Sequence, residues 1–146
     1  MRGLPLLIKL ARTAADERRV ELGRIMAAHQ AARHALVVHD HAAAAEAEAA
    51  AASAAARVAY ASWLRTDSVR RLGLEERRRA FDRTENAAHD VLRESVATLK
   101  RLETAERTAA LAARRDGARR AAARADEQQV LRGLAATVAA GTVNGM

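Results

Sequence analysis

The chain contains no cysteine, which excludes disulfide bonds and thiolate metal sites. Its single proline, Pro5, lies near the N-terminus, so no later residue of this type interrupts a helix. One Phe, one Tyr and one Trp are too few to fill a thick core. No apolar run approaches the roughly 20 residues of a membrane-spanning helix, and the stretch 4–8 is too short for a signal peptide. These absences favour a thin, helical, cytoplasmic protein.

What the chain does contain is mostly alanine, leucine, arginine and glutamate, all strong helix formers. The stretch 41–60 is nearly poly-alanine, which favours helix and loses little side-chain entropy on folding. The net charge is +7, from 25 basic and 18 acidic residues. Because acidic residues dilute the arginines throughout, neither half of the chain is a basic tail. The length fits one domain.

Apolar residues recur at alternating steps of four and three from Leu4, a spacing that predicts a helix packed along one partner. We call this stripe the seam of the first arm. It runs through Leu4, Ile8, Ala11, Ala15, Arg18, Leu22, Ile25, His29, Ala32, Leu36, His39, Ala43, Glu46, Ala50, Ser53, Arg57, Tyr60 and Leu64. A second seam runs through Leu74, Phe81, Ala88, Leu92, Ser95, Leu99, Leu102, Glu106, Ala109 and Ala113. The pattern predicts an all-α fold, a long antiparallel two-helix coiled-coil hairpin.

The turn of the hairpin is predicted at residues 65–68, because Thr66, Asp67 and Ser68 are all good N-cap types. Gly73 is the alternative position. The first choice gives arms of similar length, about 5–64 and about 69–138. Glycines near the C-terminus predict that the helix ends there, with residues 141–146 as a flexible tail.

No residue pattern indicates catalysis, a metal or a cofactor. The steps between His29, His34, His39 and His41 are five, five and two residues, which point these imidazoles in different directions on a helix. The chain also lacks a phosphate-binding glycine loop and a nucleophile motif. A two-helix rod offers no pocket for a small-molecule substrate. We therefore expect no enzyme activity, no catalytic residue, no cofactor and no metal ion.

Two surface features are candidates for binding. Arginine pairs such as Arg114–Arg115 and Arg119–Arg120 could follow phosphates, but the second arm lacks aromatics that stack on bases, so nucleic acid is an unlikely partner. Tyr60, Trp63 and Leu64 lie together near the predicted turn. An aromatic cluster on such a surface is typical of an interaction hot spot, with a plug for the turn as the alternative.

The chain resembles the FliJ family, the small coiled-coil component of the bacterial flagellar type III export apparatus. The resemblance rests on three stretches: the apolar start Leu4–Leu10 followed by ADERRVELGRIMAAHQAA, the segment VAYASWL at 58–64, and LKRLETAERTAALAA at 99–113. It implies a non-enzymatic stalk that couples the export ATPase ring to the export gate and handles export chaperones. It also implies a location at the inner face of the cell membrane, as a peripheral protein.

The resemblance also implies two contact sites. Tyr60, Trp63 and Leu64 are the candidates for the cytoplasmic domain of the export gate, although Asp67 and Arg70 stand where the family has apolar residues. Leu4, Ile8 and Leu102 are the candidates for the ATPase ring, because both chain ends meet there in a hairpin. The alternative function, from another class, is a basic coiled coil that binds DNA or the surface of a polymer granule.

Overall fold

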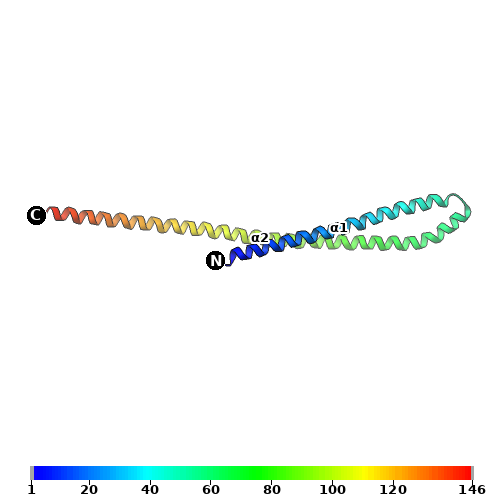
Figure 1. Ribbon diagram of the computed structural model, residues 1–146, viewed down its shortest axis with the longest axis horizontal. Helices are drawn as coiled ribbons and strands as arrows, with labels where there is room; N and C mark the ends of the chain where they lie inside the picture. The colour runs from blue at the N-terminus through cyan, green and yellow to red at the C-terminus, as the bar shows by residue number, and fades with distance from the viewer. Residues whose placement is uncertain (1, 146) are drawn as a thin grey trace. The chain divides into compact units, whose positions relative to one another are not determined.

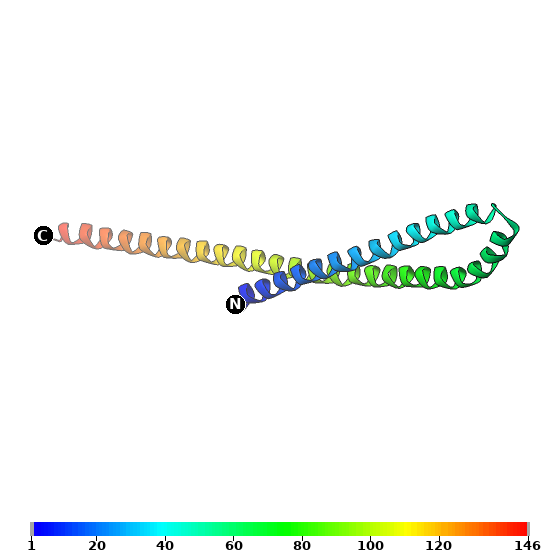
Figure 2. The same ribbon diagram turned by 45° about the vertical axis from the view of Figure 1, so that its right-hand side comes forward.

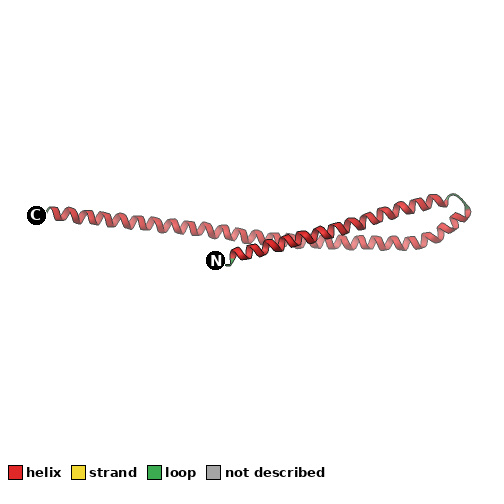
Figure 3. Ribbon diagram, in the orientation of Figure 1, coloured by secondary structure: helices red, strands yellow, loops and turns green. Residues whose placement is uncertain are grey.

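The computed structural model describes residues 2–145 and consists of two α-helices (Figure 1). Helix α1 spans Leu4–Ala50 and helix α2 spans Ala54–Val143. Within the described residues the remainder is turn or loop, as the colouring by secondary structure shows (Figure 3). Pro5 lies in the first turn of α1, where its missing N–H leaves no bond unmade. The predicted all-α class is confirmed.

The two helices form an antiparallel hairpin over the unit Leu6–Lys100, where α1 lies beside the first half of α2 (Figures 1 and 2). The remaining described residues, 2–5 and those from Arg101 onward, form a second, smaller unit. No helix of the described chain is long and apolar enough to span a membrane.

The predicted seam of α1 is the face that becomes buried. Buried side chains on α1 fall at alternating steps on that stripe, with half-buried ones between them. They are Leu4, Ile8, Ala15, Leu22, His29, Ala32, Leu36 and Ala50. Large side chains of α2 lie against small ones of α1: Leu74 and Phe81 line a hollow with Ala28, Ala31, Ala32 and Ala35. Burial of this thin apolar stripe is the main stabilising contribution.

The prediction of the turn is wrong. The chain reverses at residues 51–53, and residues 65–68 lie inside α2, as does Gly73. Ser53 is the N-cap of α2, because its Oγ accepts a hydrogen bond from the amide of Ala56 at 3.0 Å. The candidate caps have other partners: the Ser68 hydroxyl donates to the Leu64 carbonyl at 2.7 Å, and Asp67 contacts α1. Asp67 and Ser68 therefore do not end the helix, because their side chains are bonded to groups other than a free helix N-terminus.

The arms are consequently unequal, with 47 residues in α1 and 90 in α2. The second arm also runs further than predicted. It ends at Val143 rather than near residue 138, so residues 141–143 are helical and residues 144–145 form a turn. Alanine, the best helix former, dominates residues 135–140 and carries the helix past Gly133 and Gly141. Of the predicted flexible tail, Met146 lies outside the described residues.

Candidate functional site

The predicted aromatic site lies two to three helical turns into α2. The rings of Tyr60 and Trp63 are stacked, with centroids 5.6 Å apart and planes 23° from parallel. Both side chains are half-buried, while Leu64 is 42% exposed. Tyr60 and Trp63 therefore form one rigid aromatic surface, and Leu64 lies on a neighbouring, more exposed strip of the helix.

Small residues of both helices surround the aromatic pair. The groove that holds the two rings is lined by Glu46, Ala49 and Ala50 of α1 and by Ala56 and Ala59 of α2. Alanine methyl groups do not reach across the gap between the helices, so they leave part of each ring accessible. The result is an exposed apolar groove between the last turns of α1 and the first three turns of α2, with Glu46 as its acidic edge. Pairs of aromatic residues in such surroundings are typical of binding hot spots.

The three residues predicted for an ATPase contact are not equally accessible. Leu4 is 9% and Ile8 is 7% exposed, and Leu102 is half-buried. Leu4 and Leu102 belong to the smaller unit and Ile8 to the hairpin. Leu4 and Ile8 are therefore packing residues of the α1 seam, with little surface left for another protein.

The exposed apolar surface near the start of α1 is carried by residues that the sequence prediction missed. Leu6, Leu7 and Leu10 are 59%, 51% and 58% exposed. They follow one another at steps of one and three, which places them on one side of the helix, away from the seam. The sequence did contain a signal for these leucines. They lie between the seam positions Leu4, Ile8 and Ala11, and therefore on another face of the helix.

Histidine–carboxylate pairs cross the hairpin, and the sequence analysis did not predict them. The imidazole of His29 is 2% exposed as a residue, and its Nδ1 is hydrogen-bonded to Glu85 Oε2. Its Nε2 lies 4.0 Å from Asp82 Oδ1 and has no hydrogen-bond partner among residues 2–145. The hydrogen bond from His29 lowers the pKa of Glu85 below its ordinary value, against the opposing effect of burial. His89 approaches the same carboxylate at 3.8 Å.

A second pair lies closer to the turn. His39 Nε2 is 2.6 Å from Asp67 Oδ1, and both side chains are about nine-tenths buried. Beside it, Arg71 donates to Asp40 with Nε–Oδ1 of 2.9 Å, which lowers the pKa of Asp40. These contacts bind α1 to α2 at defined positions. No group of three metal-ligand side chains is found among the described residues.

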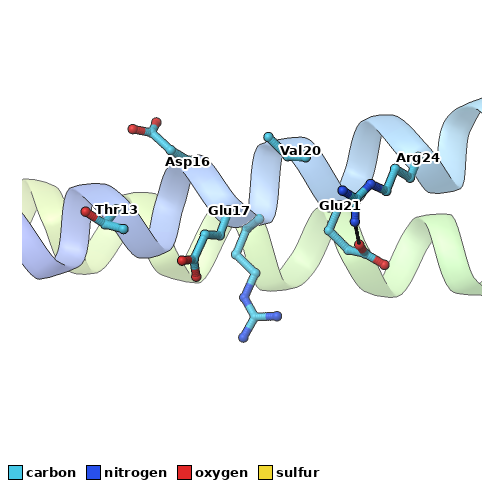
Figure 4. A pocket seen from close by; sticks show the side chains of 7 residues that line it. Thr13, Asp16, Glu17, Val20, Glu21 and Arg24 are labelled. Carbon is cyan, nitrogen blue, oxygen red and sulfur yellow. Dashed lines mark ion pairs between the residues drawn. The ribbon is translucent and has the colours of Figure 1, made fainter.

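Another hollow lies on the surface of α1 alone. Thr13, Asp16, Glu17, Arg18, Val20, Glu21 and Arg24 line it, and Figure 4 shows these side chains projecting from a single stretch of the helix. An ion pair between Arg24 and Glu21, 3.7 Å apart, lies at one end. Neighbouring turns of one helix cannot enclose a ligand, so this hollow is a feature of the side-chain surface and supports no binding site.

Compared with known proteins, the chain matches no protein family, no curated protein and no solved structure.

Proposed function

We propose that the chain is a non-enzymatic stalk of a bacterial flagellar type III export apparatus, as the resemblance to the FliJ family implies. In this role it couples the export ATPase ring to the export gate and handles export chaperones. The observation that supports the proposal most is the antiparallel two-helix hairpin between α1 and α2. This architecture agrees with the one that the resemblance implies, and its surface offers places for proteins to bind rather than an enclosed pocket.

The gate contact is assigned to the aromatic groove. Tyr60 and Trp63 present stacked rings that are only half-buried, and alanines around them leave a partner side chain room to enter. Burial of such a ring pair against a partner provides much of the binding energy in typical hot spots. Through this contact the protein is held at the cytoplasmic face of the membrane as a peripheral component.

The ATPase contact is assigned to the exposed leucines at the start of α1. Leu7 and Leu10 offer apolar surface, while Leu4 and Ile8 hold the same stretch of helix in place. A ring that encloses a shaft contacts apolar or charged groups that face outward from the shaft. The side chains of Leu4 and Ile8 are buried and do not face outward.

The proposal is tested by co-purification with the flagellar export ATPase of the same organism. Leu7→Gln/Leu10→Gln should lose most of the co-purifying ATPase while its far-UV helicity stays unchanged, since both residues are exposed. Val37→Gln/Val38→Gln is the matched control, because both valines are 53% exposed on the same helix. If both variants retained the ATPase equally, the contact would not lie at Leu7 and Leu10. Absence of any complex with wild-type protein would refute the proposed function.

A further inference from the structure

The C-terminal segment of the chain, residues 110–143, is a helix on which every residue is exposed. It belongs entirely to the smaller unit. Two groups of residues stand out along it, and both differ from the rest of the chain in composition.

The first group is a cluster of five arginines. Arg114, Arg115, Arg119, Arg120 and Arg124 fall within eleven residues that contain one acidic residue, Asp116. No side-chain ion pair is found for any of the five in the described structure, and the only bond among them runs from Arg120 Nε to the backbone oxygen of Asp116 at 3.3 Å. In the hairpin, by contrast, Arg71, Arg78 and Arg93 are paired with carboxylates. The cluster is therefore a local excess of unneutralised positive charge.

The second group is apolar and begins six residues after Arg124, beyond the acidic residues Asp126 and Glu127. Val130, Leu131, Leu134 and Val138 are 61%, 64%, 58% and 68% exposed. Their spacing of one, three and four residues places them on one side of the helix, within about 100°. Four large aliphatic side chains on one side of a helix without a partner leave a continuous apolar stripe in water.

Three of the five arginines, Arg119, Arg120 and Arg124, lie on the same side as this stripe, together with the acidic residues Asp116 and Glu127. Arg120 precedes Val138 by eighteen residues, which is five full helical turns, and Arg124 precedes Leu131 by seven, about two turns. A flat surface that contacts the stripe therefore also contacts these guanidinium groups. An interfacial helix requires this combination: aliphatic side chains for the acyl boundary and cationic ones for anionic headgroups.

We propose that the C-terminal segment binds the surface of a lipid bilayer that contains anionic lipids. Arg119, Arg120 and Arg124 contact the headgroups, and Val130, Leu131, Leu134 and Val138 enter the boundary with the acyl chains. A nucleic acid would use the arginines but would leave the aliphatic stripe in water, and the segment has no aromatic residue to stack on bases. The proposal does not depend on the export function, since it uses neither the aromatic groove nor the start of α1.

The test is flotation of the full chain with vesicles. Vesicles of equal parts phosphatidylglycerol and phosphatidylcholine should bind it, and vesicles of phosphatidylcholine alone should not. Arg119→Gln/Arg120→Gln/Arg124→Gln should reduce the partition coefficient at least about tenfold at low salt, because each cation near an anionic surface contributes substantially. Val130→Gln/Leu134→Gln should reduce it roughly fivefold or more. Glutamine favours helix, so circular dichroism should show unchanged helicity for both variants.

The matched control removes the same charge elsewhere. Arg57, Arg65 and Arg70 are exposed on α2 within the hairpin, and Arg57→Gln/Arg65→Gln/Arg70→Gln should bind vesicles nearly as wild type does. Equal loss in the control and in the cluster variant would overturn the proposal, because net charge alone would then explain binding. Failure of the wild type to bind either vesicle would also overturn it. So would binding to duplex DNA that displaces vesicles and is unaffected by Val130→Gln/Leu134→Gln.

Discussion

His39 of α1 and Asp67 of α2 face each other across the hairpin, with 2.6 Å between Nε2 and Oδ1. Both side chains are about 10% exposed, so water reaches them poorly and each is the hydrogen-bond partner of the other. The contact also places Asp67 on the face of α2 that packs against α1, within a helix that continues through residues 65–68. Replacement of Asp67 therefore tests both the pair and the position of the turn.

We expect Asp67→Ala to lower the free energy of unfolding by about 1–3 kcal/mol, since it leaves a buried imidazole without its partner. Chemical denaturation followed by circular dichroism measures this difference. Asp90→Ala is the control, because the Asp90 side chain is 73% exposed and its pair with Arg93 lies on the surface. If both substitutions had the same small effect, Asp67 would lie in solvent.

The pair of His29 and Glu85 predicts a specific dependence of stability on pH. The pKa of Glu85 in the folded protein lies below its ordinary value of 4.5, chiefly because His29 is hydrogen-bonded to it. A carboxyl with a lowered pKa stabilises the fold above about pH 4.5, and this contribution is lost as pH falls through the lowered pKa.

Glu85→Gln should therefore melt below wild type at pH 7, and the difference should shrink as the pH falls below about 4.5. Glu76→Gln, at an exposed position of the same helix, should follow the wild-type curve. Thermal melts at four or five pH values between 3 and 7 give the comparison. A constant difference across the whole range would show that Glu85 stabilises the fold without its charge.

For the aromatic groove, we expect Trp63→Ala to weaken binding to the cytoplasmic domain of the export gate by about 1–2 kcal/mol, the usual scale for a buried aromatic anchor. Its melting temperature should change little, because the site lies near the turn and far from most of the seam. Val58→Ala is the control: Val58 is 75% exposed on the same helix and should leave the affinity unaltered.

Isothermal titration of the folded variants distinguishes the two roles of the aromatic pair. Unaltered gate affinity together with a clearly lower melting temperature would identify Trp63 as a packing residue near the turn of the hairpin. In that case the gate contact would lie elsewhere on the chain.

Two proline substitutions test the observed turn directly. Ala54 is the first residue of α2 after the N-cap Ser53, a position where proline is favoured. Ala54→Pro should therefore be nearly neutral. Thr66→Pro should cost about 3 kcal/mol or more, because residue 66 lies in the interior of the helix. Denaturation curves of the two variants give the answer, and tolerance of proline at position 66 with loss of stability at position 54 would contradict the fold.

Much of the fold follows from the sequence because one repeating pattern controls it. The steps of four and three that begin at Leu4 specify the buried face of α1, and His29 and His39 lie on that face as the pattern requires. The turn does not follow, because local cap preferences favour residues 66–68, and Ser53 is a single polar residue in a run of alanines.

The histidine–carboxylate pairs between the helices could not be predicted for the same reason. Which residue of α2 faces His29 depends on how many residues the turn uses and where it lies. With the turn at 65–68, Asp67 belongs to no helix face, and Glu85 faces a different part of α1. A misplaced turn of this kind leaves the fold class correct while it changes every contact between the arms.

The alanine-rich end of the α1 seam has a mechanical consequence. Beyond Leu36 most of its apolar groups are single methyl groups, so packing there would change little if α1 slid along α2 by one heptad. The same slide, about 10 Å, would separate His29 from Glu85 and His39 from Asp67 and leave buried polar groups unpaired. The two pairs therefore fix the register of α1 against α2. Under a force along the axis, resistance to shear is concentrated at these two points, and the alanine layers between and beyond them yield first.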